Sequence, residues 1–303
     1  MPQGNKKMQG KTFPIVNEEL VLGFRPQSEW GWKIAIAFFF GELGSGLFFV
    51  SAFYDFTMGM AIGWFLVSVA KPTALMMHLG HPERAWRAIM GLGHSWISRG
   101  LLASVLFTGF GAAHILNLHY GIVSGGLATL LLVVSMASCV VVMVYLGFVL
   151  SYSPSISLWG SGIMPIISLT YALLGGVTLV LMFGYHTFLA DQPQILATLK
   201  SIELGLVLFC GVIMLSFLHG AAYASEAGKA SVALLLKHDF AKWFVPFVLL
   251  VGIAAVALIA HFGPTTFAAI LAVAVAELIG DFALKILLFK AGLYEPAIGH
   301  SRF

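Results

Sequence analysis

Long runs of apolar residues, separated by short polar stretches, dominate the sequence. A helix needs roughly 20 mostly apolar residues to cross the hydrocarbon core of a bilayer. The runs are continuous and do not alternate between apolar and polar positions, so they predict helices and exclude a membrane β-barrel. Eight segments qualify as spans: residues 34–53, 58–77, 100–118, 122–150, 164–185, 199–218, 244–260 and 266–289.

The composition agrees with a bilayer environment. Hydrophobic residues make up 59% of the 303 residues and charged residues only 10%, whereas a soluble domain carries about 25% charged residues. Cys139 and Cys210 both fall inside apolar runs and supply neither a disulfide framework nor a CxxC metal pair. The first residues lack an apolar core followed by a cleavage site, so we expect no signal peptide and no twin-arginine signal. We therefore expect an all-α integral membrane protein, a single domain over residues 1–303, with its eight helices arranged as two four-helix bundles.

The basic residues predict the orientation. Fifteen of the 16 Lys and Arg fall on the side of the membrane that holds both termini, here called the termini side, which leaves Lys200 alone on the far side. By the positive-inside rule both termini are cytoplasmic, as expected in a prokaryotic inner membrane. The termini side also holds residues 1–31 and the two longer connections, 79–99 and 219–243. The net charge of +3 therefore reflects orientation and does not indicate nucleic-acid binding.

Glu42, Lys71, Glu277, Asp281 and Lys285 lie inside predicted spans, where a charge is costly and usually faces the bundle interior. Glu42 is about ten residues past the start of its helix, roughly 15 Å deep, and Glu277 is at a similar depth. Glu277, Asp281 and Lys285 repeat every four residues and share one helix face. They form either a proton route along Glu42 and Glu277, or an Asp281–Lys285 ion pair beside a hydrogen-bonded, protonated Glu277. Lys71 either snorkels outward or pairs with Glu42.

Small residues surround Glu42 at Gly41, Gly44, Ser45 and Gly46. Small residues let a neighbouring helix backbone approach closely, and they also admit a flat ligand. Both interpretations stay open from the sequence.

Histidines raise the question of haem, because bis-His ligation needs histidines on different helices at matching depth. Almost all of them lie at the ends of predicted spans, and no pair lies clearly within the hydrocarbon of two adjacent spans. We therefore expect no haem and no other metal site. The histidines in question are His78, His81, His94 and His219 on the termini side, and His114, His119, His186 and His261 on the far side.

The connection between the second and third spans carries the densest functional signal. A quinone site needs hydrogen-bond donors for two carbonyl oxygens, a proton-exchanging group, aromatic walls and an opening to lipid. Histidine can donate and exchange protons because it titrates near physiological pH, and an acid can resupply them. The alternative is an interfacial Trp/Arg anchor that binds lipid headgroups. The stretch contains His78, His81, Glu83, Arg84, Trp86, His94, Ser95, Trp96 and Arg99.

The stretch HLGHPERAWRAIMGLGHSWISRG (residues 78–100) resembles the NrfD/PsrC/DmsC-type membrane anchors of complex iron–sulfur molybdoenzymes. Its pattern is closest to the dimethyl sulfoxide reductase anchor and its sulfite-dehydrogenase relatives. The eight spans agree with that family, as does Trp159 followed by Pro165. The resemblance implies a quinone, menaquinone or ubiquinone, no haem, a ferredoxin-like iron–sulfur partner, and a molybdenum or tungsten catalytic subunit.

The resemblance also implies roles for individual residues. His78 matches the family's quinone-linked histidine, and Ser95 and Arg99 are candidates for orienting the ring. Trp86 or Trp96 would form a wall. Anchors of the dimethyl sulfoxide type carry a glutamate where this chain has Gly100, so Glu42 or Glu83 is the expected substitute. We expect the quinone to contact His78, Glu83, Trp86, Ser95, Trp96 and Arg99. We expect Glu42 and Glu277 to carry protons.

These features predict a quinone-reactive membrane subunit of an oxidoreductase complex, whose catalytic centre resides on another chain. Two alternatives belong to other classes. One is a di-haem cytochrome b-type subunit. The other is a proton-conducting transporter built on Glu42 and Glu277, which the lack of paired broken helices in the two halves disfavours.

Overall fold

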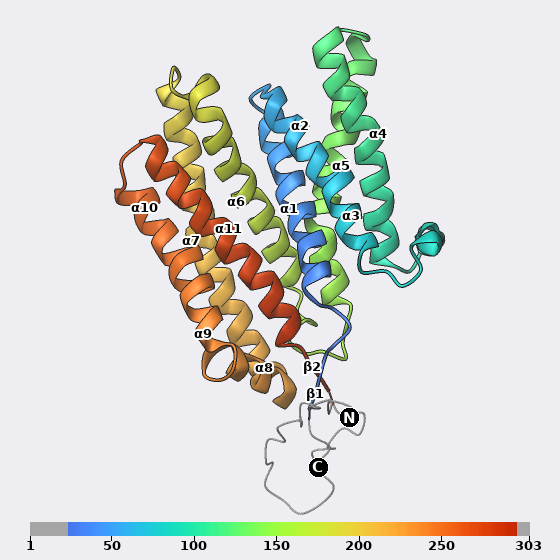
Figure 1. The fold of residues 1–303 in the computed structure, drawn as a ribbon, viewed down its shortest axis with the longest axis vertical. Coiled ribbons are helices and arrows are strands. Elements are labelled where there is room, and N and C mark those ends of the chain that lie inside the picture. The colour runs from blue at the N-terminus through green and yellow to red at the C-terminus, as the bar shows by residue number, and fades with distance from the viewer. Residues whose placement is uncertain (1–23, 296–303) are drawn as a thin grey trace, which may run out of the picture.

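The computed structural model describes residues 24–295, which are almost entirely helical (Figure 1). Among these residues eight helices are long and apolar enough to cross a membrane, and each predicted span coincides with one of them to within a few residues at the ends, except the sixth, whose helix is longer. The all-α integral membrane fold is thereby confirmed. Most of the expected N-terminal segment 1–31 lies outside the described residues, as do four cations of the charge count, namely Lys6, Lys7, Lys11 and Arg302.

Five of the eight spans are single α-helices, and three contain a stretch of wider π-helical turns. The spans, in chain order, are α1 (Trp32–Ala52); α2 (Thr57–Phe65), η1 (Leu66–Ala70) and α3 (Lys71–Met76); α4 (Trp96–Tyr120); α5 (Gly125–Ser151); α6 (Met164–Gly184) and η3 (Tyr185–Leu189); α7 (Pro193–Ala224); α9 (Ala241–Trp243), η4 (Phe244–Ala255) and α10 (Val256–Phe262); and α11 (Phe267–Lys290).

The π-helical turns in the second and seventh spans lie beside prolines. Pro72 is the second residue of α3, directly after η1, and Pro246 lies within η4. Proline has no backbone N–H and its ring crowds the preceding turn, so a wider local winding accommodates it. The structure keeps both spans helical and adds the longer π-helical stretch in the seventh, which the apolar pattern did not predict.

The first four spans and the last four form two groups that share an interface through α1, α5 and α6. Helices α1 and α6 lie side by side at the centre of the molecule (Figure 1). Their backbones touch where Gly46 faces Ala172 and Gly176. A Cβ atom at Gly46 would lie only 1.7 Å from the Ala172 carbonyl oxygen. The centre of the fold therefore depends on a glycine that permits contact between two helix backbones.

The other small residues near Glu42 also serve helix packing. A Cβ at Gly44 would lie 2.8 Å from the carbonyl oxygen of Gly63 on α2. A similar crossing joins Gly252 of η4 to Gly280 of α11. Of the two interpretations of the glycine run, close helix packing is confirmed at Gly44 and Gly46.

Both ends of the described chain lie at one end of the bundle, together with α8 (Glu226–Leu236) and α9 (Figure 1). There β1 (Arg25–Pro26) pairs antiparallel with β2 (Leu293–Tyr294). The 79–99 connection contains the 3₁₀-helix η2 (Pro82–Gly91), which projects from the flank of the bundle near the lower ends of α3 and α4. The 219–243 connection is mostly helical, because α7 continues to Ala224 and α8 follows.

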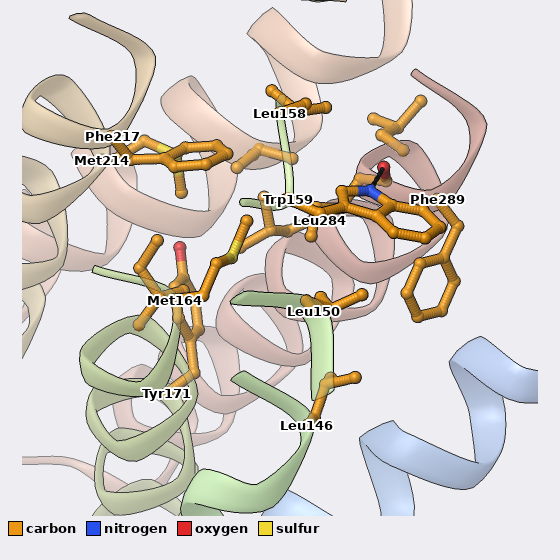
Figure 2. Packing of buried hydrophobic residues seen from close by; sticks show 14 of the residues in the cluster. Leu146, Leu150, Leu158, Trp159, Met164, Tyr171, Met214, Phe217, Leu284 and Phe289 are labelled. Carbon is orange, nitrogen blue, oxygen red and sulfur yellow. Dashed lines mark hydrogen bonds between the residues drawn. The ribbon is translucent and has the colours of Figure 1, made fainter. Parts of the chain in front are cut away.

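An aromatic and aliphatic core closes the termini side of the bundle (Figure 2). Trp159, from the segment before α6, donates its indole N–H to the Leu288 carbonyl oxygen at 2.9 Å. Its ring lies 5.5 Å from Trp30 and 5.9 Å from Phe289, between ring centroids. This core joins the entry to α6 with the end of α11 and holds the β1–β2 pair beneath it.

Candidate functional site

The polar connection runs from the end of α3 to the start of α4, which are antiparallel neighbours. Lys71 Nζ on α3 donates a hydrogen bond to Ser104 Oγ on α4 at 2.6 Å and so links the two helices. His78 lies two residues after the end of α3, and three predicted site residues, Ser95, Trp96 and Arg99, stand at the start of α4.

Ser95 and Arg99 build the start of α4. Ser95 caps the helix, since its hydroxyl oxygen accepts a hydrogen bond from the Ser98 backbone N–H at 3.4 Å. The Arg99 guanidinium donates to the carbonyl oxygens of Leu92 and Gly93, at 3.1 and 3.0 Å. Arg99 thereby fastens the connecting segment to the helix. The structure gives both residues a supporting role, and direct contact with a quinone stays a prediction.

The ring of Trp96 is held by packing, while its indole N–H has no hydrogen-bond acceptor among the described residues. Its ring stacks on Phe148 of α5 with centroids 3.9 Å apart, and the Arg99 guanidinium lies 4.7 Å from its centroid. The indole N–H is buried without a hydrogen-bond partner among residues 24–295. Buried polar groups are nearly always paired. This N–H can therefore serve an acceptor on a bound molecule, such as a carbonyl oxygen.

An open groove of about 520 Å³ follows the second span up to the residue before His78. The hydroxyl of Ser68 accepts from Thr108 at 2.9 Å, and that of Thr73 donates to the Val69 carbonyl oxygen at 2.7 Å. Since both hydroxyls are already engaged, the groove offers a mainly apolar surface. Its lining residues are Ser68, Val69, Pro72, Thr73, Met76 and Met77.

Glu83 and Trp86 lie apart from the groove. Both stand on η2, which has no buried residue. Glu83 Oε1 is 3.0 Å from His81 Nδ1 and 3.8 Å from Arg84 Nε. Trp86 is 59% exposed, with the Arg87 guanidinium 5.8 Å from its ring. The structure therefore groups these two predicted site residues on an outer surface and does not place them in the wall of the groove.

Both expectations for Lys71 are wrong. The side chain is buried, so it does not snorkel outward, and Glu42 pairs with a different residue. Lys71 Nζ bonds Ser104 and lies 4.6 Å from the Tyr145 ring centroid. Its aliphatic chain packs on Gly41, where the missing side chain leaves room for it to run inward. Within residues 24–295, no carboxylate forms an ion pair with this amine.

Glu42 takes part in a buried ion cluster between α1 and α11. Its Oε2 is 2.9 Å from Lys285 Nζ, and Lys285 also pairs with Asp281 one turn away. The predicted Asp281–Lys285 ion pair is thus confirmed. Glu42 Oε1 is buried with no hydrogen-bond partner in the described part of the chain. The same holds for the hydroxyl of Tyr171, whose ring centroid lies 5.6 Å from Lys285 Nζ.

Glu277 is linked to a second carboxyl group through one hydroxyl. Thr178 Oγ1 is 3.0 Å from Glu203 Oε1 and also forms a short hydrogen bond with Glu277 Oε2. Both glutamates are only 2% exposed and Thr178 is fully buried. The expected hydrogen bond of Glu277 is confirmed. The sequence did not identify its bridging partner on α6 or the second carboxyl group on α7.

The comparison with known families decides the class of the chain. Residues 46–289 match the family described as DMSO reductase anchor subunit (DmsC). The chain belongs to the DmsC family. The match runs from within α1 almost to the end of α11, so this DmsC-family protein is a multi-pass membrane anchor subunit of a molybdoenzyme complex. No curated protein matches the sequence.

The family assignment draws attention to Gly100, which stands where the resemblance leads us to expect a glutamate. A Cβ at this position would lie 2.3 Å from Tyr145 Cδ2. The Tyr145 ring, with Lys71 against it, therefore occupies the space that a longer side chain would need. The two expected substitute acids lie elsewhere, Glu42 in the interior ion cluster and Glu83 on η2.

Of the eight histidines weighed as haem ligands, only His114 on α4 is buried, and its Nδ1 has no hydrogen-bond partner among the described residues. Within residues 24–295, no three His, Cys, Asp or Glu side chains come together in a way that could hold a metal ion. That the DmsC-family anchor carries no haem stays a prediction, which the visible absorption spectrum of the purified complex checks.

Proposed function

We propose that this DmsC-family anchor exchanges electrons between the membrane quinone pool and a ferredoxin-like iron–sulfur subunit. That subunit in turn serves a molybdenum or tungsten catalytic subunit. In this account the chain carries the quinone reaction site and lies in a prokaryotic cytoplasmic membrane. Membership of the DmsC family supports the proposal, as does the set of residues at the start of α4.

The observation that carries the proposal is the buried, unpaired N–H of Trp96 at the start of α4, on the same connection as His78 and the apolar groove that ends beside it. His78 is half-buried just past the last groove residues, and Trp96 offers an unpaired buried N–H. A quinone combines two carbonyl oxygens on a flat ring with an apolar tail. A histidine next to an apolar groove, together with the unpaired N–H of Trp96 on the following helix, fits such a molecule.

Each residue of the site then has a chemical task. A bound quinol would supply two electrons and two protons. His78 would donate a hydrogen bond to one ring oxygen and exchange protons with the quinol. Trp96 would donate to a ring oxygen, while Ser95 and Arg99 keep its helix turn in place. Glu83, in contact with His81 at the surface, would pass protons to water.

The docking surface for soluble partners would lie at the same end of the molecule. The 3₁₀-helix η2 exposes Arg84, Trp86 and Arg87, and α8 exposes Lys229. Exposed arginine and tryptophan side chains are common at the centres of protein interfaces. Since the excess of basic residues predicts a cytoplasmic position for this side, we propose cytoplasmic partners.

Photolabelling tests the proposed location of the quinone. A photoactivatable azido-quinone added to the purified complex should attach within residues 66–99, and excess unlabelled quinone should suppress the attachment. Trp96→Phe keeps the stacking on Phe148 and removes only the N–H, so it should weaken labelling. Trp86→Phe should leave labelling unchanged. Labelling confined to the soluble subunits or to the seventh and eighth spans would contradict the proposal.

A further inference from the structure

Six buried polar side chains from four helices form a series through the interior of the bundle. We call them the core polar chain: Glu203, Thr178, Glu277, Asp281, Lys285 and Glu42. Thr178 joins the first two carboxyl groups, and Lys285 joins the last two. Glu277 of the first set and Asp281 of the second stand one helical turn apart on α11, which connects the two sets.

The core polar chain runs along the membrane normal over about 12 Å of the bilayer interior. Helices α7 and α11 both begin on the far side, and Glu203 and Glu277 each lie ten residues past the first helical residue, about 15 Å deep. Lys285 lies eight residues beyond Glu277, about 12 Å nearer the termini side. Lys200, the single cation assigned to the far side, stands one turn before Glu203. The series therefore leads from the termini-side half of the bilayer to about its middle, and Lys200 stands between Glu203 and the far side.

A count of hydrogens shows that the core polar chain holds a transferable proton. A threonine hydroxyl has one proton, so it can donate to only one carboxylate at a time. Thr178 Oγ1 nevertheless lies within hydrogen-bonding distance of both Glu203 and Glu277. For both contacts to be hydrogen bonds, one of the two carboxyl groups must carry a proton and donate it to Oγ1. A hydroxyl that accepts on one side and donates on the other is a proton relay.

Two further features distinguish the core polar chain from a purely structural ion pair. It contains four carboxyl groups and one amine, an imbalance that is costly in a membrane interior unless protons bind. Glu42 Oε1 and the hydroxyl of Tyr171, whose ring centroid lies 5.6 Å from Lys285 Nζ, are buried without partners in the described chain. Such atoms are the usual partners of buried water, which would extend a path for protons.

We propose that the core polar chain conducts protons between the quinone side and the far side of the membrane. The coupling to turnover rests on the proposed quinone function. Oxidation of one quinol to quinone releases two electrons and two protons. The electrons pass to the iron–sulfur partner on the termini side, and the protons leave along Glu42, Lys285–Asp281, Glu277, Thr178 and Glu203. Turnover then separates charge across the membrane.

Thr178 provides a matched pair of variants for the test. Thr178→Val keeps the side-chain shape and removes the hydroxyl, whereas Thr178→Ser keeps the hydroxyl. The purified complex is reconstituted in liposomes, and a potassium diffusion potential drives protons past a trapped pH dye, with no quinone present. Thr178→Val should slow this proton flux about tenfold or more, and Thr178→Ser should preserve it. Glu203→Gln should act like Thr178→Val.

The same liposomes separate this proposal from the quinone proposal. With quinol added, the unaltered complex should generate a membrane potential, and Thr178→Val should lose it while the complex stays assembled. Unchanged proton flux in both Thr178→Val and Glu203→Gln would overturn the core polar chain as a proton path. If the unaltered complex instead shows normal diffusion-driven proton flux but no quinol turnover, that result would count against the quinone site alone.

Discussion

Lys285 Nζ on α11 lies 2.9 Å from Glu42 Oε2 on α1, so the last span forms a buried ion pair with the first. The pair crosses between the two groups of four spans and stands close to the Gly46 contact of α1 with α6. Lys285 lies within the residues that match the DmsC family, and Glu42 lies just before them. The two groups of four spans are therefore joined by an ion pair as well as by the backbone contact at Gly46.

Removing the shared amine should destabilise the bundle strongly. Lys285→Met leaves Glu42 and Asp281 buried without a cation, and breaking a buried pair in this way costs about 3–5 kcal/mol. Asp281→Asn keeps the Lys285–Glu42 pair and should cost much less. Thermal unfolding of the detergent-purified protein measures both. Equal melting temperatures for the two variants would show that the ion pair contributes little to stability.

The α1–α6 crossing should tolerate no side chain at Gly46. Gly46→Ala would drive a methyl group into the Ala172 carbonyl oxygen, so we expect loss of the folded protein or a large fall in melting temperature. Gly109→Ala is the matched control, because nothing lies within 4 Å of its Cβ position. In a helix this exchange should be neutral or stabilising by up to about 1 kcal/mol. A Gly46→Ala protein as stable as the control would refute the close contact.

Reversing charge on η2 should release the soluble partners. Arg84→Glu together with Arg87→Glu replaces two exposed cations on the proposed docking surface, and like charges at an interface oppose association. Co-purification of the soluble subunits with the membrane fraction should fall sharply. Lys200→Glu, on the far side, should leave co-purification intact. A complex that survives the double reversal with full activity would place the partner elsewhere.

The sequence predicts the eight spans well because bilayer thickness sets the length of an apolar run. Helix ends are harder to predict, since a helix can continue into water with polar residues. The sixth span shows this: α7 begins at Pro193 and ends at Ala224, well beyond the expected 199–218. The early start also explains why Glu203 was missed. Counted from residue 199 it lies near the surface, whereas counted from Pro193 it lies as deep as Glu277.

The sequence predicts which residue types form the candidate site, but it does not predict how their side chains pack against one another. The residue types around His78 indicate quinone chemistry, yet the unpaired N–H of Trp96 results from how α5 presents Phe148 to it. Lys71 shows the same dependence on tertiary packing. The glycine at position 41 opens a route inward for its aliphatic chain, and a hydroxyl on α4 accepts its hydrogen bond. Local sequence patterns cannot predict these contacts, because the neighbouring residues come from other helices.

The most direct test of the quinone site compares two electron donors in the His78→Ala complex. The account predicts that turnover with quinol falls about a hundredfold or more, while turnover with an artificial dye that reduces the soluble subunits directly is unchanged. His81→Ala, which removes a neighbouring exposed histidine, should retain most quinol turnover. Full quinol turnover in His78→Ala, or an equal loss with both donors, would contradict a quinone site at His78.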